Sequence, residues 1–281
     1  MLRLLAAAAV LALLIPASAG AQTLDKIRNT GVITLGYIDN AAPFSSAGAG
    51  GEPQGYSVDL CRAVVASMGA QLKREVKARW VKLTIQDRIE AVRSRKVDLE
   101  CSTTTWTLSR QQLVDFSLVT FVDGGNLLVK AGAQLARLQD FAGKRIAAIQ
   151  GTTTDKALRA ALARAGVQAE IVAIKTRDEG LALLEQGKAD ALASDRTTLI
   201  GLVLAGKSPG AYRLLDQDFS IEQYALMLPR GDHDFRLAVN RGLAGVYRSG
   251  EIEKIYQRSL GPLGPPSLLL SATYFIQNLA E

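Results

Sequence analysis

The sequence is poor in the residues that build metal centres and nucleophilic active sites. Its 281 residues include one histidine, His233, and two cysteines, Cys61 and Cys101. No Cys/His group with metal-ligand spacing and no G-x-S-x-G motif occurs. His233 lies in the turn Gly231-Asp232-His233-Asp234, where a solvated loop residue is more common than a catalytic base. We therefore expect no metal, no cofactor and no catalytic residue.

Long hydrophobic runs are missing after the first twenty or so residues. A basic residue, Arg3, lies near the start of the chain. An apolar run at 4–15 and the small-residue sequence Ala19-Gly20-Ala21 follow it. This order predicts a secretory signal peptide at 1–21, cleaved after Ala21. Gln22, and not a cysteine, stands directly after the cleavage position, which argues against a lipid anchor. The sequence thus predicts an exported, soluble protein in the periplasm.

A long basic block is also missing. Without Arg3, the 33 basic residues become 32, against 27 acidic residues, which leaves a net charge of +5 spread along the chain. This distribution argues against a nucleic-acid partner. A mild positive field favours the approach of anions without selecting one of them.

The two cysteines leave two possibilities open. In an oxidising compartment Cys61 and Cys101 can form a disulfide. Two buried thiols that pack as small apolar side chains are an equal alternative.

The roughly 260 residues after the leader are enough for two α/β lobes. Short runs rich in β-branched residues, typical of strands, alternate with longer segments of helical periodicity. This alternation occurs twice along the chain. In the first half we expect strands at 32–36, 79–83 and 97–101, a helix opened by Ser57 or Asp59, and a helix at 85–95. In the second half we expect strands at 126–130, 145–149, 171–174, 189–193 and 223–228, and helices at 156–164, 177–186, 235–249 and 252–260. Such alternation predicts parallel sheets, whose ligands lie beyond the carboxyl ends of the strands.

Clustered hydroxyls lie at two of these strand ends. The run 100–110 contains Thr103, Thr104 and Thr105 and ends in Arg110, and the second half carries Gly151-Thr152-Thr153-Thr154 after a strand. Hydroxyls and free N–H groups at a helix start, with a guanidinium nearby, suit a small carboxylate. The alternative is that these threonines only cap helices.

With these segments in place, the chain resembles the periplasmic solute-binding proteins of polar amino acid ABC importers, family 3, and most of all the glutamate/aspartate-binding type. The residues that carry the resemblance are 24–33, 43–45, 55–60, Arg88, 98–101, 103–105, 110–111, 116–117, 151–153 and Asp195. The resemblance implies a type II periplasmic-binding fold, with two α/β lobes joined by a two-strand hinge at 126–130 and 223–228. It places lobe 1 at 22–126 plus 227–265, lobe 2 at 127–226, and a C-terminal appendage at 266–281.

The resemblance also implies a site between the lobes. Arg110, Thr105 and Thr103 would bind the ligand's α-carboxylate, with donors from Thr152 and Thr153 of the second lobe, while Asp195 would bind the α-amino group. The aromatic ring of Phe44 would form the floor of the pocket. Each of these residues could instead have a purely structural role. Arg110 could be a solvated helix residue, Asp195 and Thr153 could cap the helices that follow them, and Phe44 could be a packing residue.

The part of the pocket that would hold the ligand side chain departs from the acidic-ligand pattern. Ile38 stands where those proteins carry an arginine, and Ile85 where they carry a serine. Arg88 matches the family's other side-chain arginine, and Arg177 replaces a histidine. An ion pair of Arg88 with Asp87 or Glu90 is the alternative for that residue.

The expected function is capture of an amino acid, with glutamate or aspartate leading, and its delivery to the permease of an ABC importer in the inner membrane. The protein would act as a monomer and not as an enzyme. A periplasmic enzyme of the same fold, similar to cyclohexadienyl dehydratase and using Glu100 as its acid, is one alternative. A ligand sensor that signals to a membrane receptor is the other.

Overall fold

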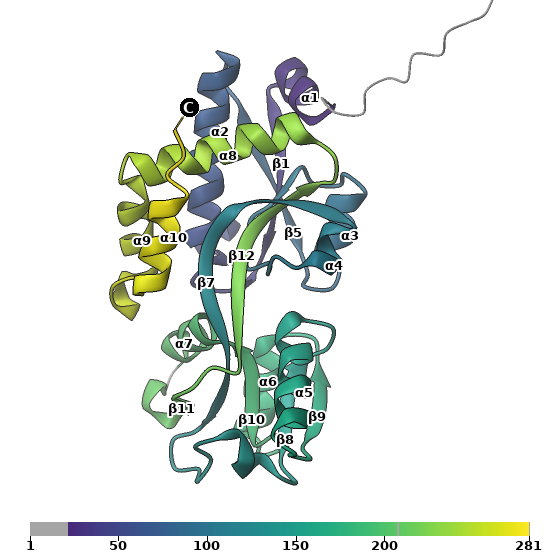
Figure 1. The fold of residues 1–281 in the computed structure, drawn as a ribbon, viewed down its shortest axis with the longest axis vertical. Helices are drawn as coiled ribbons and strands as arrows, with labels where there is room; N and C mark the ends of the chain where they lie inside the picture. Colours follow the sequence, from purple (N-terminus) through teal and green to yellow (C-terminus); the bar gives the residue numbers. More distant parts are fainter. Residues whose placement is uncertain (1–21, 207, 281) are drawn as a thin grey trace, which may run out of the picture.

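Two lobes, one above the other, make up the molecule (Figure 1). The computed structural model describes residues 22–206 and 208–280, so the expected signal peptide at 1–21 lies outside the described residues. Two long strands, β7 (Val114–Lys130) and β12 (Ser220–Pro229), run from one lobe into the other. Because the lobes meet within these strands, the expected boundaries near residues 126 and 227 stay a prediction.

Lobe 1, the upper lobe in Figure 1, is built on three parallel strands. β1 lies between β5 and β6, and pairs with both in parallel. Its elements are α1 (Gln22–Thr30), β1 (Val32–Ile38), β2 (Asn40–Ala41), β3 (Ser45–Ala47), β4 (Pro53–Gln54), α2 (Tyr56–Leu72), β5 (Lys77–Leu83), α3 (Arg88–Arg93), β6 (Leu99–Glu100), α4 (Leu108–Gln111), α8 (His233–Arg248), α9 (Glu251–Leu260) and α10 (Leu268–Ile276). The parallel pairing and the α/β succession expected from the sequence are present.

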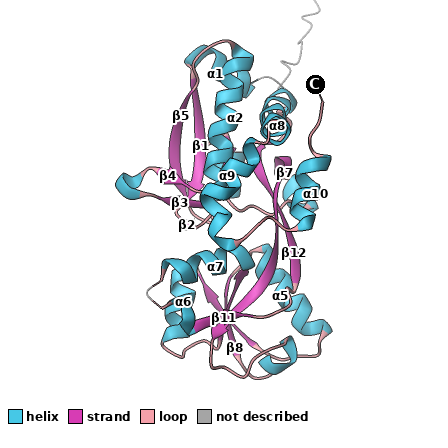
Figure 2. Ribbon diagram, turned by 90° about the vertical axis from the view of Figure 1, so that its left-hand side faces the viewer, coloured by secondary structure: helices cyan, strands magenta, loops and turns pink. Residues whose placement is uncertain are grey.

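Lobe 2 repeats this plan below (Figure 2). β8 lies between β9 and β10 and pairs with both in parallel. Its elements are β8 (Arg145–Ile149), α5 (Thr153–Arg164), β9 (Glu170–Ile174), α6 (Arg177–Glu185), β10 (Ala191–Asp195), α7 (Arg196–Ala205) and β11 (Tyr212–Leu214). Short 3-10 turns lie at Ala49–Gly51, Leu138–Phe141, Pro209–Ala211 and Gly261–Leu263.

Of the two crossing strands, β7 pairs with strands of both lobes. β7 pairs antiparallel with β12 along its first part and with β10 and β11 along its last part. The result is a nine-stranded sheet with the order β5-β1-β6-β12-β7-β10-β8-β9, with β11 also paired to β7. The expected hinge strand at 126–130 is therefore only the final third of a strand of 17 residues.

The disulfide left open by the sequence is present. Cys61 on α2 is bonded to Cys101, and their Cα atoms are 6.2 Å apart. Cys101 follows β6 directly, and the hydroxyl of Ser57 on α2 donates a hydrogen bond to the carbonyl oxygen of Ser102. The loop that leads to the threonine run is thus fixed to α2 at two successive residues.

Several elements differ from the sequence-based expectation. α2 begins at Tyr56 after Gly55, whose φ of 120° is open to glycine, so neither Ser57 nor Asp59 opens the helix. α3 is shorter than the expected helix at 85–95 because Thr84 and Asp87 form a turn before it, with the backbone N–H of Thr84 donating to Asp87. Thr152, not Thr153, caps α5 by accepting from the backbone N–H of Asp155.

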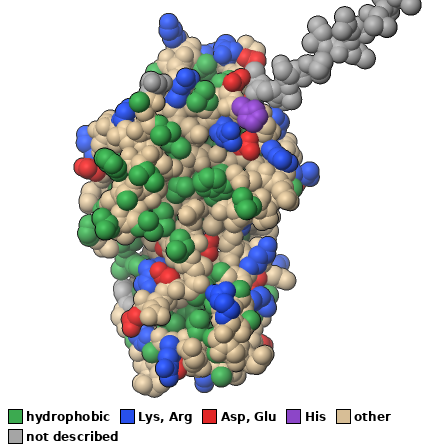
Figure 3. Space-filling view, in the orientation of Figure 1, with side chains coloured by type: hydrophobic (Ala, Val, Ile, Leu, Met, Phe, Trp, Pro, Cys, Tyr) green, Lys and Arg blue, Asp and Glu red, His purple; other side chains and the backbone are tan. Residues whose placement is uncertain are grey.

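The segment after residue 266 forms the helix α10, which packs on lobe 1. The Tyr274 hydroxyl lies 2.6 Å from the Tyr56 hydroxyl, and Leu270 and Tyr274 belong to the main core of lobe 1. Other α10 side chains face outward, and Figure 3 shows hydrophobic side chains gathered over α9 and α10 on this face. In the part of the chain that the structure describes, no helix is both long and apolar enough to cross a membrane.

Candidate functional site

A small cavity lies between the lobes at the carboxyl ends of their parallel strands. Its volume is about 20 Å³, close to the space that one water molecule needs. Lobe 1 contributes the loops after β5 and β6, and lobe 2 contributes the ends of β8 and β10 and the starts of α5 and α6. The lining residues are Ile85, Arg88, Thr103, Thr105, Ile149, Thr152, Thr153, Thr154, Arg177, Ala193, Ser194 and Asp195.

The N-terminus of α5 points donors toward this cavity. Thr152 caps the helix, which leaves the Thr153 hydroxyl free to contact the other lobe. That hydroxyl lies 3.0 Å from the hydroxyl of Thr105 in lobe 1. A helix N-terminus with flanking hydroxyls is a favourable place for a carboxylate.

Arg110 lies beside this pair of hydroxyls. It is largely buried, and its Nη1 donates a 2.7 Å hydrogen bond to the carbonyl oxygen of Thr105. Burial, and then the nearby Arg88 guanidinium, lower the pKa of Arg110 to about 10, so it stays cationic at neutral pH. Arg110 does not line the cavity itself. It lines an adjoining groove of about 750 Å³, here called the side groove.

Arg88 lines the cavity as a buried cation. Its Nη1 donates to the carbonyl oxygen of Thr103 at 3.2 Å, and its Nε has no hydrogen-bond partner. Burial lowers the pKa of Arg88, while the carboxylate of Glu100 raises it. Neither alternative ion pair is formed, since Glu90 pairs with Arg93 and Asp87 accepts from the backbone N–H of Thr84. A buried guanidinium with an unused donor is costly unless an anion shares its environment.

Asp195 and Arg177 face each other across the lobe 2 wall of the cavity. An Asp195 carboxylate oxygen lies 4.0 Å from Arg177 Nη2, and the other oxygen accepts a 2.6 Å hydrogen bond from Thr154. Arg177 Nε donates to the Ser194 hydroxyl. The cavity therefore carries fixed charges of both signs.

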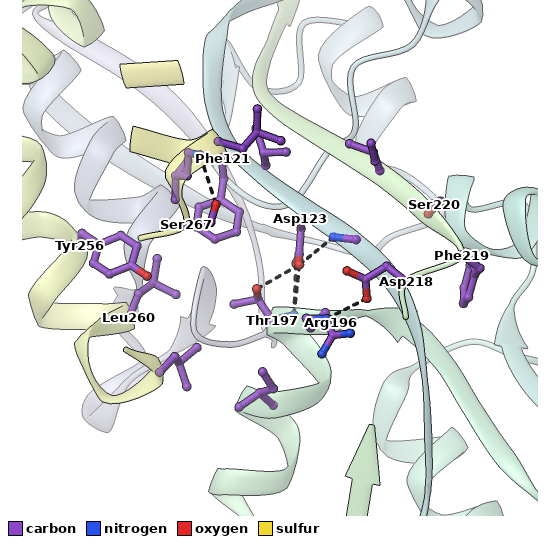
Figure 4. A pocket seen from close by; sticks show the side chains of 17 residues that line it. Phe121, Asp123, Arg196, Thr197, Asp218, Phe219, Ser220, Tyr256, Leu260 and Ser267 are labelled. Carbon is purple, nitrogen blue, oxygen red and sulfur yellow. Dashed lines mark hydrogen bonds and ion pairs between the residues drawn. The ribbon is translucent and has the colours of Figure 1, made fainter. Parts of the chain in front are cut away.

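Asp195 does not cap the helix that follows it. The N-terminal donors of α7 are taken by Asp123 on β7, which accepts from the backbone N–H and the hydroxyl of Thr197 (Figure 4). Asp123 also accepts from the Tyr224 hydroxyl at 3.2 Å. Burial, and then the charge of Asp195, raise the pKa of Asp123 to about 7. Because Asp123 accepts from the N-terminal donors of α7, the Asp195 carboxylate is available to the cavity.

Two buried carboxylates near the cavity were not among the expected ligand-binding residues, although Glu100 was the candidate acid of the alternative enzyme. Glu222 on β12 accepts hydrogen bonds of 2.7 Å from the hydroxyls of Thr105 and Ser220. Glu100 accepts from the Thr104 hydroxyl, and its other oxygen has no partner. Burial is the main cause that raises the pKa of both groups.

Phe44 lies in the core of lobe 1, away from the cavity lining. Its ring makes edge-to-face contacts with Tyr56, Phe121 and Tyr224. Ile38 is buried in a core cluster, whereas Ile85 lines the cavity. Trp106 is 39% exposed and lines the side groove.

The lobes also touch directly around the cavity. Arg177 Nη1 donates to the Asn40 carbonyl oxygen at 2.8 Å, and the Asn40 amide donates to Asp178. Gln86 donates to the carbonyl oxygen of Lys175 at 3.2 Å. The structure therefore shows the lobes closed against each other.

A further groove, of about 660 Å³, lies beside the hinge (Figure 4). Its walls come from β7, α7, α9 and the segment that leads into α10. Its polar side chains bond to one another, as Arg196 Nε does to Asp218 at 2.7 Å. It is separate from the charged cavity.

The sequence matches the family described as bacterial extracellular solute-binding proteins, family 3, over residues 33–262. The chain is a family 3 bacterial extracellular solute-binding protein. The binding protein is 36% identical over 252 residues to the L-glutamate/L-aspartate-binding protein of Pseudomonas aeruginosa, covering 89% of this chain and 83% of that protein. It is 30% identical over 254 residues to the glutamate/aspartate import solute-binding protein of Escherichia coli K12, covering 90% and 84%. These matches confirm the expected family.

Solved structures share the fold of the binding protein. A mutant of ArgBP from T. maritima superposes with a TM-score of 0.74 at 24% identity, covering 85% of this chain and 99% of that one. An ABC uptake transporter substrate binding protein from Streptococcus pneumoniae with bound histidine gives a TM-score of 0.76 at 20% identity, covering 84% and 95%. The expected two-lobed type II fold is confirmed. Its relatives act outside the cytoplasm, as the family name states.

Proposed function

We propose that the binding protein captures one free amino acid between its lobes and delivers it to an ABC importer. The observation that carries this proposal is the cavity in which Arg88, Arg177 and Asp195 face the hydroxyls of both lobes. A zwitterion needs donors for its carboxylate, an anion for its ammonium and a site that excludes water. The relatives named above, whose names state glutamate and aspartate binding and import, support the same function.

The expected roles of the site residues form part of the proposal. The α-carboxylate of the ligand lies between Thr105, Thr153 and Arg110, with further donors from Thr103 and Thr152. The α-ammonium group binds Asp195. Support comes from the position of Thr153 at the start of α5 and from the absence of a capping bond on Asp195.

Glutamate and aspartate are the proposed ligands because two cationic side chains line the far part of the cavity. Arg88 carries the unused Nε donor, and Arg177 lies near enough to influence the pKa of Arg88. A distal carboxylate would neutralise this pair. Ile85 stands where the acidic-ligand pattern has a serine and cannot bind a distal carboxylate. The preference for an acidic ligand therefore depends on Arg88 and Arg177 alone.

Ligand capture requires the lobes to open and close. A cavity of about 20 Å³ is too small for an amino acid, so the lobes part to admit one. A ligand held by both lobes favours the closed form because it has differential affinity for the two states. The permease in the inner membrane would recognise that closed form, with the binding protein acting as a monomer in the periplasm after removal of its signal peptide.

The test is a thermal-shift screen of the twenty amino acids, followed by calorimetry with L-glutamate, L-aspartate and L-glutamine. We expect glutamate or aspartate to bind best. In Arg88→Met, glutamate affinity should fall by about 30-fold or more, since losing a buried charge partner costs on the order of 2 kcal/mol or more. Glutamine affinity in the same variant is the internal control for folding and should fall much less. A screen in which no amino acid raises the melting temperature contradicts the proposal.

We also propose that the site binds its ligand without transforming it. Glu100 was the acid considered for an enzyme similar to cyclohexadienyl dehydratase. It is fully buried and does not line the cavity. Product formation from prephenate or arogenate would contradict this part of the proposal.

A further inference from the structure

Glu222 is a buried carboxylate at the edge of the proposed site. It lies on β12, is 2% exposed, and uses both oxygens as acceptors. One oxygen accepts from the Thr105 hydroxyl at 2.7 Å, and the other accepts from the Ser220 hydroxyl at 2.7 Å. None of the roles assigned above includes this residue.

The Thr105 hydroxyl links Glu222 to the carboxylate clamp. This hydroxyl also lies 3.0 Å from the hydroxyl of Thr153, and the Thr105 carbonyl accepts from Arg110. A hydroxyl has one proton and donates to one acceptor at a time. As long as Glu222 accepts that proton, the Thr105 hydroxyl cannot donate to the carboxylate of a ligand.

The charges around Glu222 are mixed. Asp195 on β10 is the nearby anion, and it raises the pKa of Glu222 after the larger effect of burial. Arg110 on α4 is the nearby cation, because Glu222 is the carboxylate that most raises the Arg110 pKa. Tyr224 lies on the same strand, and Lys156 on α5 lines the same side groove. The carboxylate of a ligand bound beside Thr105 would therefore add a further negative charge next to those of Glu222 and Asp195.

We propose that Glu222 holds, in the free protein, the donors that the α-carboxylate of the ligand takes over, and that binding adds one proton from solvent to a Glu222 oxygen. The inference rests on the proposed function, because it needs an α-carboxylate at Thr105, Thr153 and Arg110. Two ionised carboxylates that share one hydroxyl and one guanidinium repel each other, and protonation of one of them removes the repulsion. The protonated oxygen of Glu222 then donates a hydrogen bond, whereas the ionised carboxylate of the free protein only accepts hydrogen bonds.

The side groove gives this proton a route. The groove has a volume of about 750 Å³ and is lined by Glu222, Arg110 and the exposed Lys156. This groove adjoins the cavity, since Thr105 and Thr153 line both, and it brings solvent to the edge of the Glu222 side chain. Water in this groove can deliver the proton without opening of the lobes.

Glu222 would consequently tune affinity for every α-amino acid. Its ionised form competes with the ligand for Thr105, so affinity should fall as the pH rises. The side chain of the ligand is bound elsewhere, at Arg88 and Arg177. The effect should therefore be the same for glutamate and for a neutral amino acid.

The experiment is calorimetry of L-glutamate binding at pH 7.5 in buffers with different ionisation enthalpies. We expect the unmodified protein to take up about half a proton or more per ligand. In Glu222→Gln we expect no uptake, and affinity at pH 8 should rise about tenfold, the equivalent of one pKa unit. Glu170→Gln is the matched control. Glu170 is exposed at the amino end of β9, whereas the cavity lies at the carboxyl ends of the parallel strands.

Each other outcome overturns the inference in a distinct way. Binding without proton uptake in the unmodified protein overturns it and leaves the proposed function intact, and this measurement does not depend on the folding of any variant. Uptake that persists in Glu222→Gln assigns the proton to another group. Loss of affinity in Glu222→Gln means that Glu222 binds the ligand's ammonium group instead. Failure of every amino acid to bind removes the proposed function as well.

Discussion

Gly201 on α7 lies directly against the carbonyl group of Ala42. A Cβ atom at Gly201 would come within 2.6 Å of the Ala42 oxygen and 2.8 Å of Pro43 Cδ. Gly201 belongs to lobe 2 and Ala42 to lobe 1, so this close approach exists only when the lobes are closed. We therefore expect a side chain at this position to hinder closure and to leave the fold of either lobe intact.

Gly201→Ala should therefore weaken ligand binding while leaving the folded protein intact. Overpacking costs about 1–3 kcal/mol, which corresponds to a loss of roughly five-fold to over a hundred-fold in affinity. Titration calorimetry measures the effect. Gly245→Ala on α8 is the matched control, since a Cβ there meets nothing within 4 Å. Equal affinities of the two variants would mean that closure does not require this contact.

Arg110→Ala should lower amino acid affinity by about one and a half to three and a half decades, because removal of one partner of a buried charge pair costs on the order of 2–5 kcal/mol. The control is Arg230→Ala, since Arg230 is exposed and donates to the backbone carbonyl of Gln112. Calorimetry on folded protein that shows unchanged binding in Arg110→Ala would remove Arg110 from the site.

Removal of the disulfide should destabilise the protein. The bond closes a chain segment of 40 residues, for which loop entropy predicts about 4 kcal/mol of stability. We expect Cys61→Ala with Cys101→Ala to lower the urea midpoint strongly. Dithiothreitol should shift the midpoint of the unmodified protein in the same direction and leave that of the double variant unchanged. Identical midpoints under oxidising conditions would show that the bond contributes nothing.

Asp123 should make stability fall with rising pH. Its pKa in the folded protein is about 7, above the usual value of 3.8. The stabilising contribution of its protonated form is complete below about pH 4 and is lost as the pH rises through 7. Relative to Asp123→Asn, the unmodified protein should lose on the order of 1 kcal/mol per pH unit between pH 5 and 7.

Chemical denaturation at pH 5, 6, 7 and 8 measures this difference. Asp234→Asn is the control, because Asp234 is exposed on α8. If the unfolding free energies of the unmodified protein and Asp123→Asn stay parallel over this range, Asp123 is ionised throughout.

The strand ends that build the site were predictable from local pattern. β8 matches the expected strand at 145–149, and the hydroxyl-rich turns follow β6 and β8 as the periodicity indicates. This succeeds because apolar strands ending in small polar residues carry both the fold signal and the site signal. Asp195 came from the family resemblance instead, because the expected strand at 189–193 stops short of it, whereas β10 ends at Asp195.

The residues of the hinge were harder to find. The Gly124-Gly125 pair and Asp123 are typical of a break, yet β7 runs through them because β12 pairs with it on one side. Glu222 precedes the expected strand at 223–228, and its contacts with Thr105 come from segments 117 residues apart. One signal was available, since Glu222 alternates with the buried Tyr224 and Leu226 on one face of β12.

The two strands that cross between the lobes, β7 and β12, have a practical consequence. Both α1 and α10 lie on lobe 1, so lobe 2 is carried as an insertion between β7 and β12 (Figure 1). Fluorescent proteins fused to the two ends of the described chain would ride on the same rigid body and would report little of the motion. A biosensor built on this scaffold needs one fluorophore in a lobe 2 surface turn, such as the exposed Gly187-Lys188 after α6.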